Sequence, residues 1–178
     1  MPNWCSNSIT IKGPASEIQA LWDRAVKTDG LLSAMCPMPE DLEGTSAPSE
    51  TANWYDWCNE HWGTKWDVSL EGLEIDVSQD GTAEITGYFD SAWAPPIDAY
   101  SGYSEANPQI TIEAYYEEGG MCFVGYWDTA GADDHYEYDG ATSDNIRSII
   151  PEYLVDFYAL DERIAEYEEE EDEEEMAE

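Results

Sequence analysis

The sequence of 178 residues is short of positive charge. It has six Lys and Arg residues against 41 Asp and Glu residues, which gives a formal net charge of −35. A chain of this charge repels nucleic acid and anionic lipid, so direct binding to either is disfavoured. The charge favours a basic partner instead, and salt should weaken that attraction.

Three other features are also missing from the sequence. The four cysteines form no CxxC pair, which disfavours a zinc site and a dense disulfide framework and favours reduced, mostly buried thiols. No stretch approaches the ~18 apolar residues of a membrane span. The N-terminal MPNWCSN has no basic region followed by an apolar run. We therefore expect a soluble, cytoplasmic protein.

Motifs of catalysis are absent as well. The chain contains no GxSxG, P-loop, HExxH or GxGxxG, and neither of its two histidines has a nucleophile partner in the sequence pattern. We therefore predict a protein that is not an enzyme and that needs no cofactor.

Aromatic residues are abundant and predict a folded body. Eight Trp and 12 Tyr lie in a chain that is 42% apolar, unlike a disordered acidic protein. Four of the tryptophans lie in WYDWCNEHWGTKWD, at positions 54, 57, 62 and 66. They could form a stacking platform or a cation cage with Lys65, but a platform for bases needs a positive surround. We favour core packing, since each buried aromatic removes ~150 to 250 Å² from water.

The pattern of apolar residues predicts an α+β fold. Alternation predicts strands at residues 3–12, 73–78, 82–90 and 109–116, and helical spacing predicts helices at 15–28 and from Pro96 to about Ala106. A long loop is expected over 29–53, followed by a short helix through Trp62, and MCFVGYW adds one hairpin strand. The order strand, helix, strand, strand, helix, strand is that of the ferredoxin-like split βαβ fold with an antiparallel sheet.

Several motifs also carry a family resemblance. They are MPNWCSNSITIKG, MCPMPED at 35–41, the tryptophan segment, FDSAWAPP at 89–96 and EEGGMCFVGY at 117–126. In this order they resemble the YubB-type ferredoxin-like domain family of phage and plasmid proteins, over roughly residues 1–128. The resemblance implies a mobile-element origin and the same fold, and it implies no catalytic residues.

The C-terminal part is predicted to be an acidic extension over 129–167 and a disordered tail over 168–178. Apolar residues recur at alternating steps of four and three from Ile146 to Tyr167, and Pro151 fits the first turn of a second helix. This stripe could pack on the chain's own body, which we favour, or pair two subunits as a homodimer. The EYEEEEDEEE run beyond it is expected to be disordered by self-repulsion.

Two groups of acidic residues are candidate partner-binding sites. Alternation places the first group on the sheet face away from the helices: Glu74, Asp76, Glu84 and Glu113. The second group is Asp133, Asp134, Glu137 and Asp139. Asp133, His135, Glu137 and Asp139 would share one face of an extended segment, and together they could hold a divalent metal ion. We favour a solvated acidic strand there and predict no metal, since chance clusters are common in so acidic a chain.

These observations lead to one functional hypothesis and two alternatives. The hypothesis is a non-enzymatic mimic of nucleic acid that blocks a basic nucleic-acid-binding protein of host defence, of the restriction or CRISPR type. The first alternative is a small-ligand-binding protein or enzyme that uses the tryptophan-rich cleft. The second is adaptation to high salt, in which case the acidic surface implies no specific partner.

Overall fold

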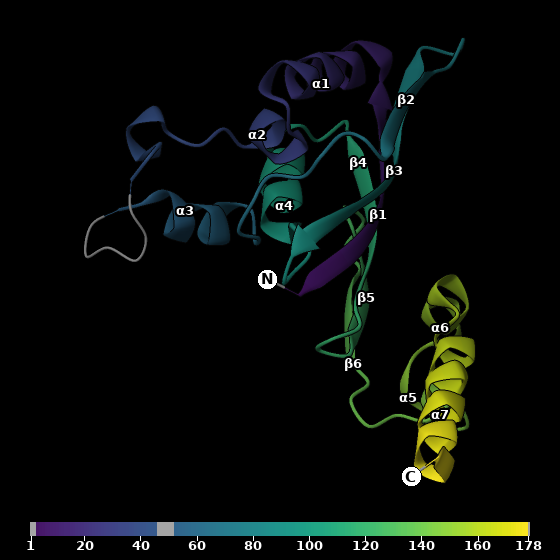
Figure 1. The fold of residues 1–178 in the computed structure, drawn as a ribbon. Helices are drawn as coiled ribbons and strands as arrows, with labels where there is room; N and C mark the ends of the chain where they lie inside the picture. The colour runs from purple at the N-terminus through teal and green to yellow at the C-terminus, as the bar shows by residue number, and fades with distance from the viewer. Residues whose placement is uncertain (1–2, 46–51, 178) are drawn as a thin grey trace.

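The computed structural model describes residues 3–45 and 52–177, and its centre is a single antiparallel sheet (Figure 1). Within these residues the sheet has six strands in the order β2-β3-β1-β4-β5-β6. Their bounds are Trp4–Pro14 (β1), Leu73–Val77 (β2), Thr82–Ala92 (β3), Thr111–Glu118 (β4), Phe123–Asp128 (β5) and Asp133–Glu137 (β6). The fold is therefore a mixed α+β fold, as the sequence predicts.

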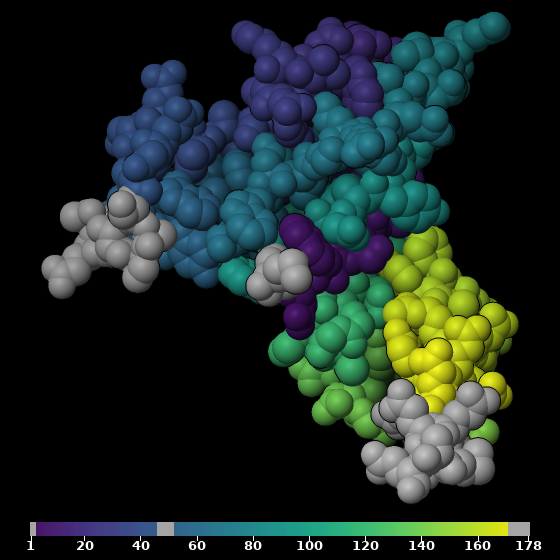
Figure 2. Space-filling view, viewed as in Figure 1, coloured from purple at the N-terminus to yellow at the C-terminus, as the bar shows by residue number. Residues whose placement is uncertain are grey.

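Helices lie on both sides of the sheet, but at different ends (Figure 1). The helices on one side are α1 (Ala15–Thr28), α2 (Leu31–Met35), α3 (Trp54–His61) and α4 (Ile97–Ala106). The helices on the other side, next to β5, are α5 (Ile146–Ile149), α6 (Glu152–Tyr158) and α7 (Leu160–Ala177). We call this second group the C-terminal layer, and Figure 2 shows it in yellow against the green strands, away from the blue helices.

The main core lies between the sheet and helices α1–α4. Ile11 of β1 pairs with Ile85 of β3 and with Ile112 of β4, so three isoleucines form one row across the sheet. All three are fully buried in the same cluster as residues of α1 and α4. Strict alternation along β1 places Thr10 and Lys12 on the opposite face.

A second, smaller core lies under the C-terminal layer. Val124 of β5 is buried together with Tyr138, Ile146, Ile150, Leu154, Val155 and Leu160. The predicted helical stripe thus packs on the chain's own sheet. Its register in α6 differs from the prediction, since Leu154 and Val155 are buried and Phe157 is exposed. Ala159 is left-handed (φ 48°) and ends α6 before α7 begins.

Three expectations about the chain's organisation need correction. The predicted loop over 29–53 contains α2 and a 3-10 turn (Glu40–Leu42), and its residues 46–51 lie outside the described residues. The predicted fold adds one strand after β4, but the acidic strand expected at residues 133–139 also joins the sheet, as β6, and pairs with β5. Residues 168–177 continue α7 where disorder was expected, and glutamate has a good helix propensity.

The tryptophan segment is mostly core, with one exception. Trp62 is only 4% exposed, and its indole N–H donates to the carbonyl of Cys36 at 2.8 Å. Trp54 and Trp57 are partly buried and pack against the same cluster. Trp66, by contrast, is 39% exposed, because Gly63 (φ 80°) turns the chain away from α3 before it.

This difference predicts unequal effects of two similar substitutions. Trp62→Ala should lower the free energy of unfolding by about 3–5 kcal/mol, since it leaves a cavity and an unpaired Cys36 carbonyl. Trp66→Ala should lower it by only about 1 kcal/mol, because Trp66 is over a third exposed and lies outside the main core. Urea unfolding of both variants measures the difference, and equal losses would contradict the burial described above.

Candidate functional site

The four acids predicted for the open sheet face do share that face. The register places Asp76, Glu84, Lys12 and Thr111 in one cross-strand row and Glu74, Thr86, Thr10 and Glu113 in the next. Directly paired residues point to the same side of a sheet. Both rows therefore lie opposite the isoleucine row that packs under α1 and α4.

The carboxylates in these rows are close neighbours. Asp76 lies directly opposite Glu84, a pairing in which Cβ atoms are typically ~4.5 to 5.5 Å apart and like charges repel. Lys12 lies next to Glu84, with 3.9 Å between its Nζ and Glu84 Oε2. The ammonium of Lys12 therefore neutralises part of one row, and the other row keeps its full charge.

Asp128 extends the second row, although the sequence analysis did not select it. It lies at the end of β5, directly opposite Glu113. Its carboxylate accepts the N–H groups of Ala132 and Ala130 and the hydroxyl of Tyr126, and these bonds lower its pKa. Asp128 is thus a fixed, ionised member of the acidic face. Its only sequence signal was its place at the end of a predicted strand.

Of the second predicted group, Asp134 alone is placed by the register on the side of the acidic face. Asp133 and Glu137 pair with Trp127 and Phe123 and lie on the side of α4, since Trp127 packs against the main core. Asp134 lies on the opposite side, where the Tyr153 hydroxyl donates to its carboxylate at 2.6 Å. Asp139 follows the end of β6.

The expected shared face of an extended segment is confirmed for Asp133, His135 and Glu137. His135 lies near the Tyr116 hydroxyl, with 3.1 Å between its Nδ1 and that oxygen. In the part of the chain that the structure describes, no group of three or more His, Cys, Asp or Glu side chains could hold a metal ion.

Two cations of the C-terminal layer are paired with acids. Arg147 of α5 forms 2.8 Å ion pairs with Asp156 and with Asp161, and hydrogen bonds to these two carboxylates raise its pKa. Arg163 of α7 pairs with Glu117 at 3.3 Å. Each of these cations contacts at least one carboxylate, so none of them is available to offset the remaining acids.

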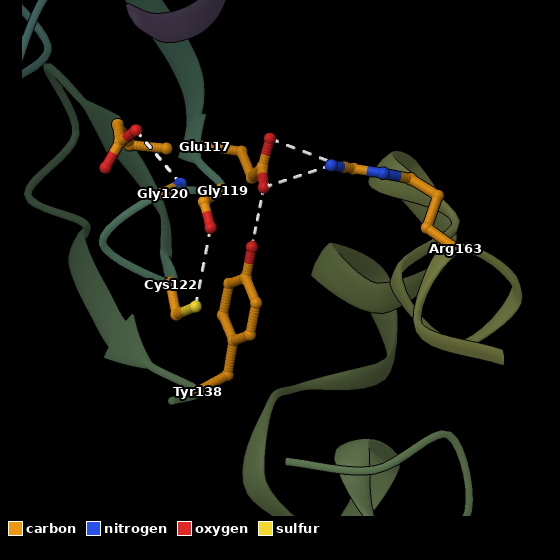
Figure 3. Close-up of polar contacts among 7 residues, drawn as sticks. Glu117, Gly119, Gly120, Cys122, Tyr138 and Arg163 are labelled. Atoms are coloured by element: carbon orange, nitrogen blue, oxygen red, sulfur yellow. Dashed lines mark hydrogen bonds and ion pairs between the residues drawn. The ribbon is translucent and has the colours of Figure 1, made fainter. Parts of the chain in front are cut away.

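A buried charged cluster attaches the C-terminal layer to the sheet (Figure 3). Glu117 of β4 is almost fully buried, and its Oε1 accepts the Tyr138 hydroxyl at 2.6 Å. Burial raises the pKa of Tyr138, and the hydrogen bond and charge of Glu117 raise it further. Partial burial lowers the pKa of Arg163, but the Glu117 carboxylate raises it by more. The three side chains therefore satisfy one another's hydrogen-bonding groups between β4 and α7.

A cavity of about 210 Å³ lies beside this cluster. Its lining includes Cys122, Ala141, Leu160 and Ile164. Burial raises the pKa of the Cys122 thiol, and nearby carboxylates raise it further, so the thiol stays protonated. Its Sγ donates to the Gly119 carbonyl at 3.4 Å (Figure 3). A protonated thiol is a poor nucleophile, and the cavity is better suited to packing than to covalent chemistry.

The other cysteines are also free thiols. Burial raises the pKa of Cys5 to about 12 and that of Cys58 to about 11. The predicted reduced thiols are thus present, although Cys36 and Cys122 are only partly buried.

Comparisons with known proteins yield one structural similarity. No family model matches the chain, and no curated protein matches it. A crystal structure of the protein api92 from Yersinia pseudotuberculosis, of the family DUF1281, superimposes with a TM-score of 0.43 at 18% sequence identity. The match covers 60% of this chain and 39% of that chain. Among the described helices, none is long and apolar enough to cross a membrane.

The buried ion pair can be tested by a double-mutant cycle. Arg163→Met should lower the free energy of unfolding by about 2 kcal/mol, because it leaves the Glu117 carboxylate buried without its cation. Adding Glu117→Gln should recover part of that loss, since the neutral amide is less costly to bury. Arg147→Met, at an exposed ion pair, is the matched control and should change stability far less. A double variant as unstable as the sum of its single variants would contradict this account.

Proposed function

We propose that this protein is a non-enzymatic mimic of nucleic acid that occupies the basic cleft of a nucleic-acid-binding host-defence protein, of the restriction or CRISPR type. One observation carries the proposal. The acids in the two rows of the open sheet face outnumber Lys12, the cation of these rows, and Lys12 already lies 3.9 Å from Glu84. A surface of this kind can attract only a positively charged partner, and it does so most strongly at low salt.

The spacing of the acids supports mimicry as well as simple attraction. Residues two apart along a strand are ~6.6 Å apart, and neighbouring strands are ~4.8 Å apart, so the carboxylates form a regular lattice. Charges on strands are also held more rigidly than charges on loops. A basic cleft that binds phosphates at set positions can therefore bind such a lattice without a large entropy loss.

Helix α7 adds a second polyanion in the C-terminal layer, on the same side of the sheet. Nine of the ten residues 166–175 are Asp or Glu, and α7 extends to Ala177. At 1.5 Å of rise per residue, this gives one negative charge per ~1.7 Å of helix axis. Duplex DNA also carries one charge per ~1.7 Å of its axis. The linear charge density of this segment is thus close to that of DNA.

We further infer that the first four strands have the ferredoxin-like arrangement of the YubB-type family. The sheet order β2-β3-β1-β4, with α1 and α4 as connections on one face, supports this finer assignment. A phage or plasmid origin and action in the host cytoplasm belong to the same proposal.

The proposal predicts that the position of the acids matters as well as their number. The variant E74K/D76K/E84K/E113K should capture a basic DNA-binding protein from bacterial lysate at least tenfold more weakly, because four attractions become repulsions. The control D41K/E43K/E60K/E105K changes the net charge equally at exposed acids on the side of α3 and α4. It should keep most of the binding. Captured proteins are identified, and release of labelled duplex DNA from them is measured at rising salt.

Other outcomes favour the alternatives. Equal losses in both variants would mean that net charge alone drives capture, and mimicry by this face would be rejected. A small molecule that copurifies with the protein would favour ligand binding. Unfolding of the wild-type chain at low ionic strength would favour adaptation to high salt.

A further inference from the structure

Large aromatic side chains are exposed at one end of the acidic face. Trp4 at the start of β1 is 49% exposed, and Tyr88 of β3 is 65% exposed. They line a groove of about 460 Å³ together with Glu71 and Asp90. Exposed aromatic residues gathered in one place are uncommon on a soluble protein and mark interaction surfaces. We call this the Trp4–Tyr88 groove.

The neighbouring aromatic rings already contact a cation. The ammonium of Lys65 lies 4.3 Å from the ring centroid of Trp66 and 5.2 Å from that of Trp93. Trp66 in turn contacts Trp4, with 6.0 Å between ring centroids. Lys65 therefore covers the rings of Trp66 and Trp93, whereas the groove is lined by Trp4 and Tyr88.

The charge of the groove is negative. Glu71 and Asp90 are both exposed, and within the described residues neither carboxylate takes part in a hydrogen bond or an ion pair. Asp67 also lines the groove, but its carboxylate is used by the N–H groups of Leu32 and Ser33 at the start of α2. No Lys or Arg is among the lining residues. The groove thus combines aromatic walls with two free carboxylates.

We propose that the Trp4–Tyr88 groove binds an arginine side chain from the basic segment of a protein partner. A guanidinium is planar, so it stacks on an aromatic ring and donates paired hydrogen bonds to a carboxylate at the same time. A lysine ammonium is a more strongly hydrated point charge and offers no planar face. The same combination of Trp, Tyr and Arg is enriched at the energetic centres of protein interfaces.

The groove is continuous with the acidic face. Glu84, Thr86, Tyr88 and Asp90 follow one another on the same side of β3, each two residues after the last. Tyr88 is four residues from Glu84, which is ~13 Å along the strand. An arginine held in the groove would place the next basic residues of an extended segment over the acidic rows. This inference rests on the proposed function, because it specifies how the partner of that face is recognised.

Two labelled peptides of equal charge provide the test. Binding of fluorescein-labelled hexaarginine and hexalysine is measured by fluorescence anisotropy at ~0.15 M salt. The wild-type protein should bind hexaarginine about tenfold more tightly than hexalysine. The variant W4T/Y88T should lose this preference and bind both peptides equally. The control Tyr167→Thr removes an exposed aromatic residue from the C-terminal layer and should keep the preference.

A second variant keeps the test valid if W4T/Y88T does not fold. E71Q/D90N changes only exposed carboxylates and should reduce the preference for hexaarginine at least threefold. Equal binding of both peptides by the wild-type protein, or a preference that survives in W4T/Y88T and E71Q/D90N, would overturn the inference.

The E74K/D76K/E84K/E113K variant separates this inference from the proposed function. If it weakens both peptides equally and leaves the preference intact, the groove recognises arginine and the face supplies general attraction. If the wild-type protein prefers hexaarginine but releases no DNA from any captured protein, arginine binding by the groove is supported and the proposed mimicry of nucleic acid is rejected.

Discussion

Strand β1 is hydrogen-bonded along both edges, and its register constrains the rest of the sheet. Residues Trp4–Pro14 pair with β3, and Ser6–Lys12 pair with β4. The side chains of a strand alternate between faces, so a shift of one residue would exchange the isoleucine row with the row of Lys12 and Glu84. That shift would bury charge and expose the core. The hydrophobic effect therefore sets the position of the acids as firmly as it sets that of the core.

The C-terminal layer covers one half of the sheet face that lies opposite α1–α4 and leaves the other half open. The apolar sides of α5 and α6 pack against Val124 of β5 and against Tyr138. The Glu117–Arg163 ion pair attaches α7 to β4. The strands β2, β3 and the end of β1 stay open on that side. A buried carboxylate in so acidic a chain is costly unless it is paired, and the pairing uses one of only two basic residues after residue 66. With so few basic residues in this part of the chain, the position of Arg163 helps to determine where the C-terminal layer attaches to the sheet.

Regular alternation made the first five strands readable from the sequence, and the remaining features depended on tertiary context. The segment DDHYE of β6 has polar residues on both faces, so period-two analysis detected no buried side. The break at Ala159 has no glycine or proline to announce it. Trp62 and Trp66 lie four residues apart in the same tryptophan-rich segment, so the sequence does not distinguish them. The turn at Gly63 decides which of the two is buried. The acids of the open face were placed correctly, while the Trp4–Tyr88 groove joins residues far apart in the chain and has no local signal.

The two outermost strands bear some of the acids of each predicted group, and this has a consequence for self-association. Strand β2 presents Glu74 and Asp76, and strand β6 presents Asp133, Asp134 and Glu137. An edge strand has unpaired backbone N–H and carbonyl groups that can recruit another edge, and in this way sheets aggregate. Because both edges carry carboxylates, any such edge-to-edge contact would bring like charges together, and they would repel each other. Charge repulsion at the two edges therefore disfavours edge-to-edge pairing of the sheet without closure into a barrel or a covering segment.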